Sequence, residues 1–291
     1  MDVNIKSREG VYIAADKSGS KSLDFLYGRF AGRLILLLLT RRFVSNIVSV
    51  YMNSRYSKHR IRKTIEQSNI DLSEFESTDY KSYNDFFTRK IKSGKRTVDM
   101  DAFSFVSPCD AKVSAYKISE NSSFYIKNSY YTVSDLLGGN NGLADEYING
   151  YCLVFRLTVD DYHRYCYIDD GEKGENIFIP GILHTVNPIS FGKYKIFKRN
   201  CREYTVMKTK NFDNVVQIEI GALFVGRIKN LHGRHEFKRG EEKGMFEFGG
   251  STIVLLVKNN IIDIDSDILT NTAEGVETLV HYGEHIASAT N

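Results

Sequence analysis

The sequence predicts an α+β chain, with a helical part over residues 1–100 and a predominantly antiparallel β part over residues 101–291. Three observations lead to this fold class. Apolar residues recur at helical spacing near the N-terminus, and two further segments before residue 100 have helical character. The segments after residue 100 are short and rich in Val, Ile, Tyr and Phe. With 291 residues and 42% hydrophobic content, the chain can bury a substantial core.

The N-terminal part combines an apolar helical face with positive charge. Residues 1–63 hold 13 Lys and Arg against 4 Asp and Glu, a balance of +9, so the rest of the chain carries 26 against 32, or −6. A helical stripe is formed by Leu26, Phe30, Leu34 and Leu38, and Arg29 and Arg33 share a different face.

The apolar run in this part is short. A membrane-spanning helix needs about 20 mostly apolar residues, whereas the uninterrupted run Leu34–Leu39 has six. We therefore expect the segment to lie on an anionic bilayer surface without crossing it. The alternative is a helix packed on its own domain with a solvated basic face.

The remaining elements follow in order along the chain. Residues 57–76 and 82–93 read as helices, with Asp71 or Ser73 as a cap. Strands are predicted within residues 111–118, 123–133, 151–159, 175–186, 214–228 and 252–264, each bounded by Gly, Asn or Asp. The stretch "FEFGGSTIVLL", residues 246–256, is unusual because two glycines and two hydroxyl side chains interrupt an otherwise apolar strand.

Composition excludes several classes of protein. The four cysteines form no CxxC pair, which argues against a zinc knuckle or a disulfide framework and favours a reducing cytoplasm; they are Cys109, Cys152, Cys166 and Cys201. The first twenty residues are polar and predict no signal peptide. We expect no bound metal and no nucleic-acid partner.

Two polar features in the β part could carry chemistry. "FVSPCDAKV" places Asp110 after a Ser-Pro turn, where a carboxylate is held in a fixed direction; a turn aspartate bonding its own backbone is the commoner use. "LTVDDYHRYCYIDDG" places His163 at a strand end beside Asp160, Asp161 and Tyr162. A lone histidine there is more often structural than catalytic.

A third polar feature follows in "GILHTVNPISFGKYKIFKRNCREYTVM". It supplies candidate substrate-binding residues, namely His184, Asn187, Asn200 and Arg202. Such side chains are good partners for a carboxylate or phosphate, and they are equally suited to holding loops.

Taken in order, the motifs resemble the phosphatidylserine decarboxylase family. The matching stretches are "SPCDAKV", "DYHRY", "HTVNP", "FKRNCREY", "EIGALFVGRI" and "KGMFEFGGSTIVLL", over roughly residues 80–260. The resemblance implies a proenzyme that cuts itself between Gly250 and Ser251 into chains 1–250 and 251–291. It also implies that Ser251 becomes a pyruvoyl group, and that Asp110 and His163 form the charge-relay pair.

Two positions depart from the family pattern. Ala111 stands where the family commonly has glycine, a small change. Cys166 stands where many members have a second histidine, so His163 must cover both roles or His184 must help.

The implied chemistry accounts for the interrupted strand. Ser251 Oγ must approach the carbonyl of Gly250, and glycine has no Cβ to obstruct that approach. A serine hydroxyl needs a base to take its proton, and a carboxylate can fix the tautomer of that base. The resulting pyruvoyl group would serve as the electron sink when carbon dioxide leaves phosphatidylserine to give phosphatidylethanolamine.

A lipid substrate also suits the basic, apolar N-terminus. We expect a peripheral enzyme on the cytoplasmic side of the cell membrane, with phosphatidylserine, the two chains of one precursor and a homodimer as its partners. The alternatives are a pyruvoyl decarboxylase of a small amino acid, a serine hydrolase and a non-catalytic lipid-binding module. A hydrolase would stay one chain, and a binding module would release no carbon dioxide.

Overall fold

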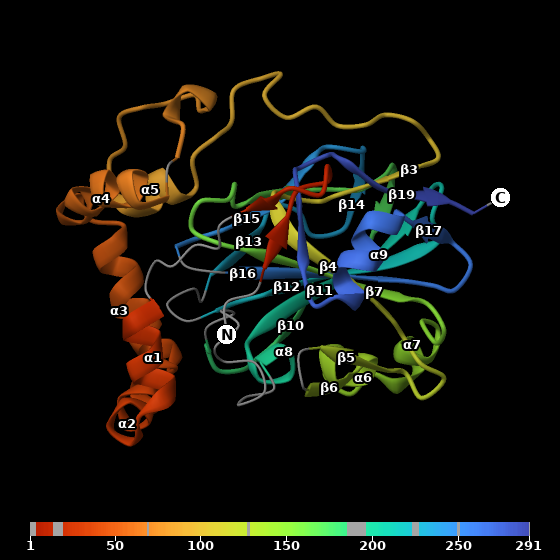
Figure 1. Ribbon diagram of the computed structural model, residues 1–291, viewed down its shortest axis with the longest axis horizontal. Coiled ribbons are helices and arrows are strands. Elements are labelled where there is room, and N and C mark those ends of the chain that lie inside the picture. Colours follow the sequence, from red (N-terminus) through yellow and green to blue (C-terminus); the bar gives the residue numbers. More distant parts are fainter. Residues whose placement is uncertain are drawn as a thin grey trace.

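The computed structural model describes residues 4–13, 20–68, 70–126, 129–184, 196–222, 227–248 and 251–290 (Figure 1). Its α-helices are α1 (Ser20–Gly28), α2 (Phe30–Leu39), α3 (Arg42–Met52), α4 (His59–Ser68), α5 (Tyr83–Phe87), α6 (Val133–Leu136), α7 (Asn141–Asp145), α8 (Ile196–Arg199) and α9 (Ser266–Ala273). Two 3₁₀ turns, η1 and η2, span Arg55–Lys58 and Leu72–Glu74.

One large sheet organises the described part of the chain. Its strand order is β14 (His235–Phe237), β9 (Gly171–Lys173), β11 (Arg202–Thr209), β12 (Asn214–Ile220), β16 (Ser251–Val257), β7 (Tyr151–Leu157), β4 (Ala111–Lys117), β18 (Glu277–Val280), β1 (Ile5–Lys6) and β2 (Tyr12–Ile13), with β10 (Ile177–Ile179) also on β11. All its described pairings are antiparallel except β1 with β18. The expectation of helices combined with a mainly antiparallel sheet is confirmed.

Smaller sheets cover the two faces of the large sheet. Above it in Figure 1 lie β13 (Ile228–Asn230), β15 (Glu242–Phe246) and β8 (Arg164–Cys166), together with β17 (Ile262–Ile264), β19 (His285–Ala289) and β3 (Ser104–Val106). Below it lie the pair β5 (Ser123–Ile126) and β6 (Ser129–Thr132) with α6, α7 and α8.

The central strands are apolar on both faces because both faces are covered. On β16, Ile253 and Leu255 pack into one core cluster, and Val254 and Leu256 pack into the other. Successive side chains of a strand point to opposite faces, so a doubly buried strand is a continuous apolar run. This explains the run that follows Ser251.

The N-terminal helices project to one side of the sheets (Figure 1). The predicted segment 25–52 is divided among α1, α2 and α3, and among the described residues no helix is long and apolar enough to cross a membrane. The Asp71 cap is confirmed, since its carboxylate accepts a 2.8 Å hydrogen bond from Ser73 N.

The structure departs from a wholly helical N-terminal part. Residues 5–6 and 12–13 form β1 and β2 at the edge of the large sheet. Strands of two residues are too short to show a periodic pattern, so only the pairing of β1 with β18 reveals them.

Candidate active site

Ser251 is the first residue of β16 and is fully buried. It lies opposite Leu157 on β7, and the next residue, Thr252, lies opposite Ile220 on β12. The strand is therefore held by ladders on both sides at this point. Ser251 Oγ has no hydrogen-bond partner among the described residues, and Gly249 and Gly250 lie outside them. A buried hydroxyl without a partner is costly, so this position is a candidate for function.

His163 is also fully buried, just before β8. Its Nδ1 lies 2.9 Å from the carbonyl oxygen of Asp161, which assigns the proton to Nδ1 because a carbonyl only accepts. Its Nε2 is then an acceptor, and it is buried with no partner within the described structure. Burial, reinforced by the positive charge of Arg89, lowers the pKa of His163 to about 3. The imidazole is therefore neutral at physiological pH.

The segment before Ser251 packs against His163. Phe246 N donates a 2.9 Å hydrogen bond to the carbonyl of His163. Phe87 lies against the imidazole at a centroid distance of 3.9 Å and against Phe248 at 5.7 Å. Ser251 follows Phe248 by three residues, a reach of at most about 10 Å. Two buried polar atoms without described partners, Ser251 Oγ and His163 Nε2, thus belong to one region.

Asp110 is paired with residues other than His163. Its carboxylate accepts hydrogen bonds from Arg96 (2.7–3.1 Å) and from Tyr282 N (2.7 Å), and it lies 3.8 Å from His281 Nδ1. Burial would raise the pKa of Asp110, but the nearby His281 and the hydrogen bonds from Arg96 lower it to about 2. Among the described residues, Asp110 thus pairs with Arg96, Tyr282 N and His281, and the charge-relay pairing with His163 stays a prediction.

The sheet register sets Asp110 apart from Ser251. Ser251 lies opposite Leu157, and the neighbouring Arg156 lies opposite Lys112 on β4. Asp110 immediately precedes β4, so it begins a strand that is two strands away from β16, about 10 Å across the sheet. Two motifs that belong to one family pattern in the sequence therefore need not be in contact in the folded sheet.

A buried ion pair holds the turn that carries His163. Lys112 Nζ contacts both carboxylate oxygens of Asp161 at 2.7 Å, and Asp161 also accepts a hydrogen bond from Thr158 N at 2.6 Å. Arg89 donates to the carbonyl of Asp161 at 3.2 Å. Asp160 and Asp161 were evident in the sequence as an acidic pair before His163. Their basic partners, Lys112 and Arg89, could not be identified from the sequence.

Two of the candidate substrate-binding residues, Asn200 and Arg202, hold the main chain with their side chains. Asn200 exchanges hydrogen bonds with the backbone of His184 at 2.8 and 3.0 Å and donates to the carbonyl of Gly221 at 2.7 Å. The guanidinium of Arg202 donates to four backbone carbonyls at 2.6–2.9 Å. The structure thus gives Asn200 and Arg202 the loop-holding role that was the alternative, and Asn187 lies outside the described residues.

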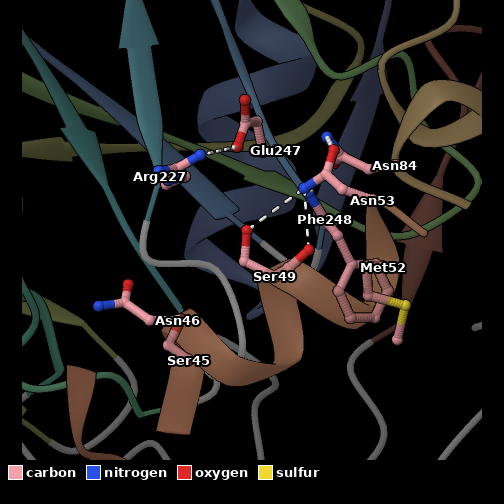
Figure 2. Close-up of a pocket in the computed structure, with 9 residues that line it drawn as sticks. All are labelled: Ser45, Asn46, Ser49, Met52, Asn53, Asn84, Arg227, Glu247 and Phe248. Atoms are coloured by element: carbon pink, nitrogen blue, oxygen red, sulfur yellow. Dashed lines mark hydrogen bonds and ion pairs between the residues drawn. The ribbon is translucent and has the colours of Figure 1, made fainter. Parts of the chain in front are cut away.

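Helix α3 reaches the segment before Ser251 (Figure 2). A narrow pocket lies between them, lined by Ser45, Asn46, Ser49, Met52, Asn53, Asn84, Arg227, Glu247 and Phe248. Asn84 Oδ1 accepts a 2.9 Å hydrogen bond from Phe248 N, and Arg227 pairs with Glu247 at 3.6 Å. The N-terminal helices are thus in contact with the candidate site.

The sequence of this chain was compared with protein families and with known proteins. A family model described as phosphatidylserine decarboxylase matches residues 83–288. The chain is 47% identical to phosphatidylserine decarboxylase proenzyme 2 of Clostridium acetobutylicum over 98% of both chains. It is 40% identical to a phosphatidylserine decarboxylase proenzyme of Clostridium botulinum over 93% of this chain and 94% of the relative, and 37% identical to one of Clostridium novyi over 97% of both.

The chain belongs to the phosphatidylserine decarboxylase family. Cys166 stands where many family members have a second histidine, and the structure shows its surroundings. Cys166 is fully buried, its N donates to Pro108 O at 2.9 Å, and burial raises the pKa of its thiol to about 12. It therefore cannot serve as a base near neutral pH. The imidazole beside Asp110 is His281, which sequence reasoning missed because it lies 171 residues further along the chain.

Proposed function

We propose that this chain is a proenzyme that cuts itself between Gly250 and Ser251, and that the product decarboxylates phosphatidylserine to phosphatidylethanolamine. Family membership supports the activity, because the relatives are described as phosphatidylserine decarboxylase proenzymes. The observation that carries the cleavage site is the buried Ser251 Oγ, which has no hydrogen-bond partner within the described structure and begins a strand fixed on both sides. A hydroxyl held in this way is available to attack the carbonyl that precedes it.

His163 is the proposed base. Its Nδ1 proton is directed to the Asp161 carbonyl, so Nε2 is the atom that can accept a proton from Ser251 Oγ. A pKa of about 3 makes His163 a weak base. Each chain needs to cut itself only once, so a weak base is sufficient for a slow single event.

Asp110 is proposed as a positioning residue. It anchors Arg96 and the main chain at Tyr282, and it faces His281. The carboxylate charge of Asp110 holds Arg96 and Tyr282 N at the start of β4. Asp110 thus acts through its neighbours without direct contact with His163.

The residues present fit a pyruvoyl group formed from Ser251. The fit rests on the buried Ser251 Oγ, His163 Nε2 and Thr252 Oγ1, which have no partners in the described part of the chain. When formed, such a group supplies an electron sink for loss of carbon dioxide from the head group. This chain's own residues exclude water, since Ser251 and His163 are fully buried and Phe87 and Phe248 pack beside the imidazole.

We also propose that α2 and α3 rest on the bilayer that holds the substrate. Each exposes apolar side chains at i, i+4 and i+7: Phe30, Leu34 and Leu37 on α2, and Phe43, Ile47 and Val50 on α3. The face of α3 bearing Ser45 and Ser49 lines the pocket beside Phe248. The same helix therefore joins an apolar outer surface to the candidate site. The proposed location is peripheral, on the cytoplasmic side, with a homodimer as a further proposed assembly.

The first experiment follows self-cleavage. Purified protein on a denaturing gel should separate into pieces of 250 and 41 residues, since 291 minus 250 is 41. Ser251→Ala should stay as one folded chain, and Ser251→Cys, which restores a nucleophile, is the matched variant. Cleavage that persists in Ser251→Ala would refute the assignment.

The second experiment assigns the imidazole. His163→Ala should cleave slowly, whereas His184→Ala should cleave at the normal rate. His281→Ala tests the action of Asp110, and slow cleavage in both His281→Ala and Asp110→Asn would support it. Prompt cleavage in His163→Ala would contradict the role of His163. Thermal melting must show that each variant is folded.

The third experiment separates the remaining functions. Carbon dioxide should be released from phosphatidylserine vesicles and not from free serine. Release from free serine would favour a small-amino-acid decarboxylase. A single stable chain that hydrolyses esters would favour a serine hydrolase.

Membrane contact can be tested separately. Flotation with phosphatidylserine vesicles should be lost when Phe43, Ile47 and Val50 are replaced by Ser, which removes the apolar stripe of α3. Phe103→Ser is the control because Phe103 is 64% exposed, close to the 73% of Phe43, and lies outside these helices. Unchanged flotation of the triple variant would contradict the bilayer proposal.

A further inference from the structure

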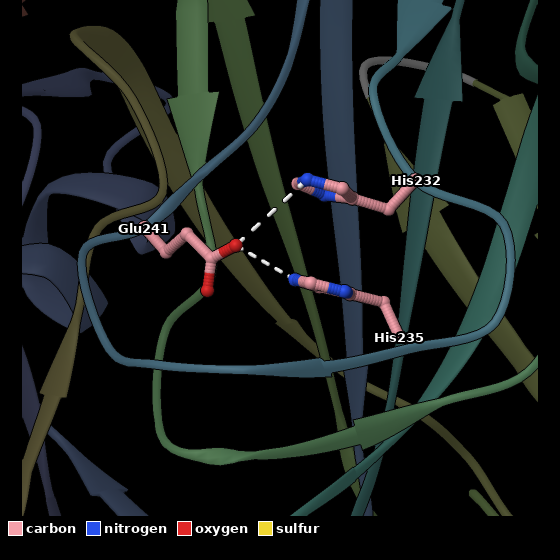
Figure 3. A group of neighbouring side chains, drawn as sticks. All are labelled: His232, His235 and Glu241. Atoms are coloured by element: carbon pink, nitrogen blue, oxygen red, sulfur yellow. Dashed lines mark hydrogen bonds and ion pairs between the residues drawn. The ribbon is translucent and has the colours of Figure 1, made fainter.

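Two histidines and one glutamate converge at the edge of the large sheet, apart from the candidate active site (Figure 3). His232 follows β13, His235 begins β14 and Glu241 precedes β15. One ligand atom from each lies within 4.8 Å of the others. Glu241 Oε1 is 2.7 Å from His235 Nε2 and 3.8 Å from His232 Nε2. The imidazole rings are stacked, with a centroid distance of 3.9 Å and an interplanar angle of 10°.

Two of the three side chains have a hydrogen-bond partner outside the cluster, and the third residue is fixed through its backbone. Tyr167 OH lies 3.1 Å from His232 Nδ1, and Lys238 N donates to Glu241 Oε2 at 3.0 Å. His235 is fixed by the β14–β9 ladder, where it lies opposite Lys173. The second ring nitrogen of His232 and the second carboxylate oxygen of Glu241 are thus occupied. The two Nε2 atoms and Oε1 are left directed to one point.

The loop backbone is anchored as well. Lys173 Nζ donates to the carbonyls of His232 and Gly233 at 3.1 and 2.5 Å. Asn176 also donates to the carbonyl of His232, at 2.9 Å. The loop that presents His232 is therefore anchored by Lys173 and Asn176.

We propose that His232, His235 and Glu241 bind one divalent transition-metal ion of the zinc type. Two imidazole nitrogens and a carboxylate oxygen are a donor set that zinc prefers. The separations are 2.7 Å, a hydrogen bond between His235 and Glu241, and 3.8 Å; both are close to the roughly 3.3 Å between two ligands of a tetrahedral ion with bonds of about 2.0–2.1 Å. The side chains are 27%, 29% and 32% exposed, which leaves a fourth position for water.

The surroundings support a ligating role. Tyr167 OH holds the Nδ1 side of His232, as partners outside the ligand set commonly orient a histidine ligand.

An ion at this position would link three segments of the chain. It would tie the loop after β13 and the start of β14 to the turn before β15. β15 leads to Phe246, whose N bonds His163 O, and then to Ser251. The ion would therefore act as a clamp at the far end of the strand that leads to Ser251. This inference does not depend on the proposed cleavage.

Metal binding can be measured on the full chain without an affinity tag, after treatment with a chelator. Zn²⁺ is titrated in competition with a chromophoric chelator, and Co²⁺ is titrated by visible absorption, which is intense for a four-coordinate ion. We expect one equivalent of each metal. Zn²⁺ should also raise the melting temperature.

Variants test the ligand assignment. His232→Ala, His235→Ala and Glu241→Gln should each lose at least the roughly 10–100-fold in affinity that loss of an outer partner costs, and Tyr167→Phe should lose an amount in that range. His59→Ala is the matched control, because His59 is exposed on α4 and outside the cluster. Melting without metal verifies that each variant is folded. Absence of one-equivalent binding, or equal affinity in all three ligand variants and the control, would overturn the proposal.

Discussion

Because His163 is buried and neutral, the precursor should become less stable as the pH falls, and His163→Gln should remove this part of the pH dependence. The imidazole is fully buried, and its pKa is lowered to about 3 by burial, against about 6.5 in an unfolded chain. Between these two values the unfolded chain binds a proton that the folded chain does not. Stability therefore falls as the pH drops below about 6.5.

The size of the effect follows from the two pKa values. From pH 7 to pH 5 the unfolded state gains about 2 kcal/mol from protonation of this one residue, while the folded state gains almost nothing. The result changes little if the folded pKa lies one unit higher, because pH 5 is still above it. The effect is thus set mainly by the unfolded chain.

The assay is urea unfolding of the Ser251→Ala precursor, a single chain, followed by far-ultraviolet circular dichroism because the protein has no tryptophan. His163→Gln is made in this background, since an amide keeps a donor but cannot take up a proton. The parent should lose about 2 kcal/mol more than His163→Gln between pH 7 and pH 5. The buried His184 is present in both proteins, so its contribution cancels.

His59→Gln is the control for this measurement, because it removes an exposed imidazole and should leave the decline of the parent in place. Parallel declines in the parent and in His163→Gln would refute the reasoning. They would mean that the folded protein protonates His163 as readily as the unfolded chain does.

Three further outcomes are expected. Asp110→Asn should destabilise the precursor by about 2–3 kcal/mol at pH 7 and by less at pH 3, because the pKa of Asp110 is about 2 when folded against about 3.9 when unfolded, and the stability from this difference is lost as the pH falls through these values; an equal loss at both pH values in urea unfolding would contradict this. Lys243→Met should cost about 3–5 kcal/mol, because Glu219, 2.6 Å away and equally buried, loses its cation, and adding Glu219→Leu should recover most of it. A double variant as unstable as Lys243→Met would argue against an ion-pair origin. Cys166→Ala should cleave at nearly the normal rate on a denaturing gel, because burial raises the thiol pKa to about 12; slow cleavage in a folded variant would show that the thiol takes part.

The family, an apolar strand within residues 252–264 and the helical character of the N-terminal part were all evident in the sequence. These features are local or ordered along the chain. The apolar run after Ser251 reads as a buried strand because each of its faces meets a core cluster. The Asp71 cap was predictable for the same reason, since its hydrogen bond spans only two residues.

The partners of the site residues depended on the tertiary structure. Asp110 was expected beside His163, but the sheet register puts it with Arg96 and with His281, which is 171 residues away in sequence. His163 instead meets the carbonyl of Asp161, an atom that every residue carries and no sequence pattern can single out. Which side chains meet across a sheet depends on strand order and register, and both are set by packing of the whole chain.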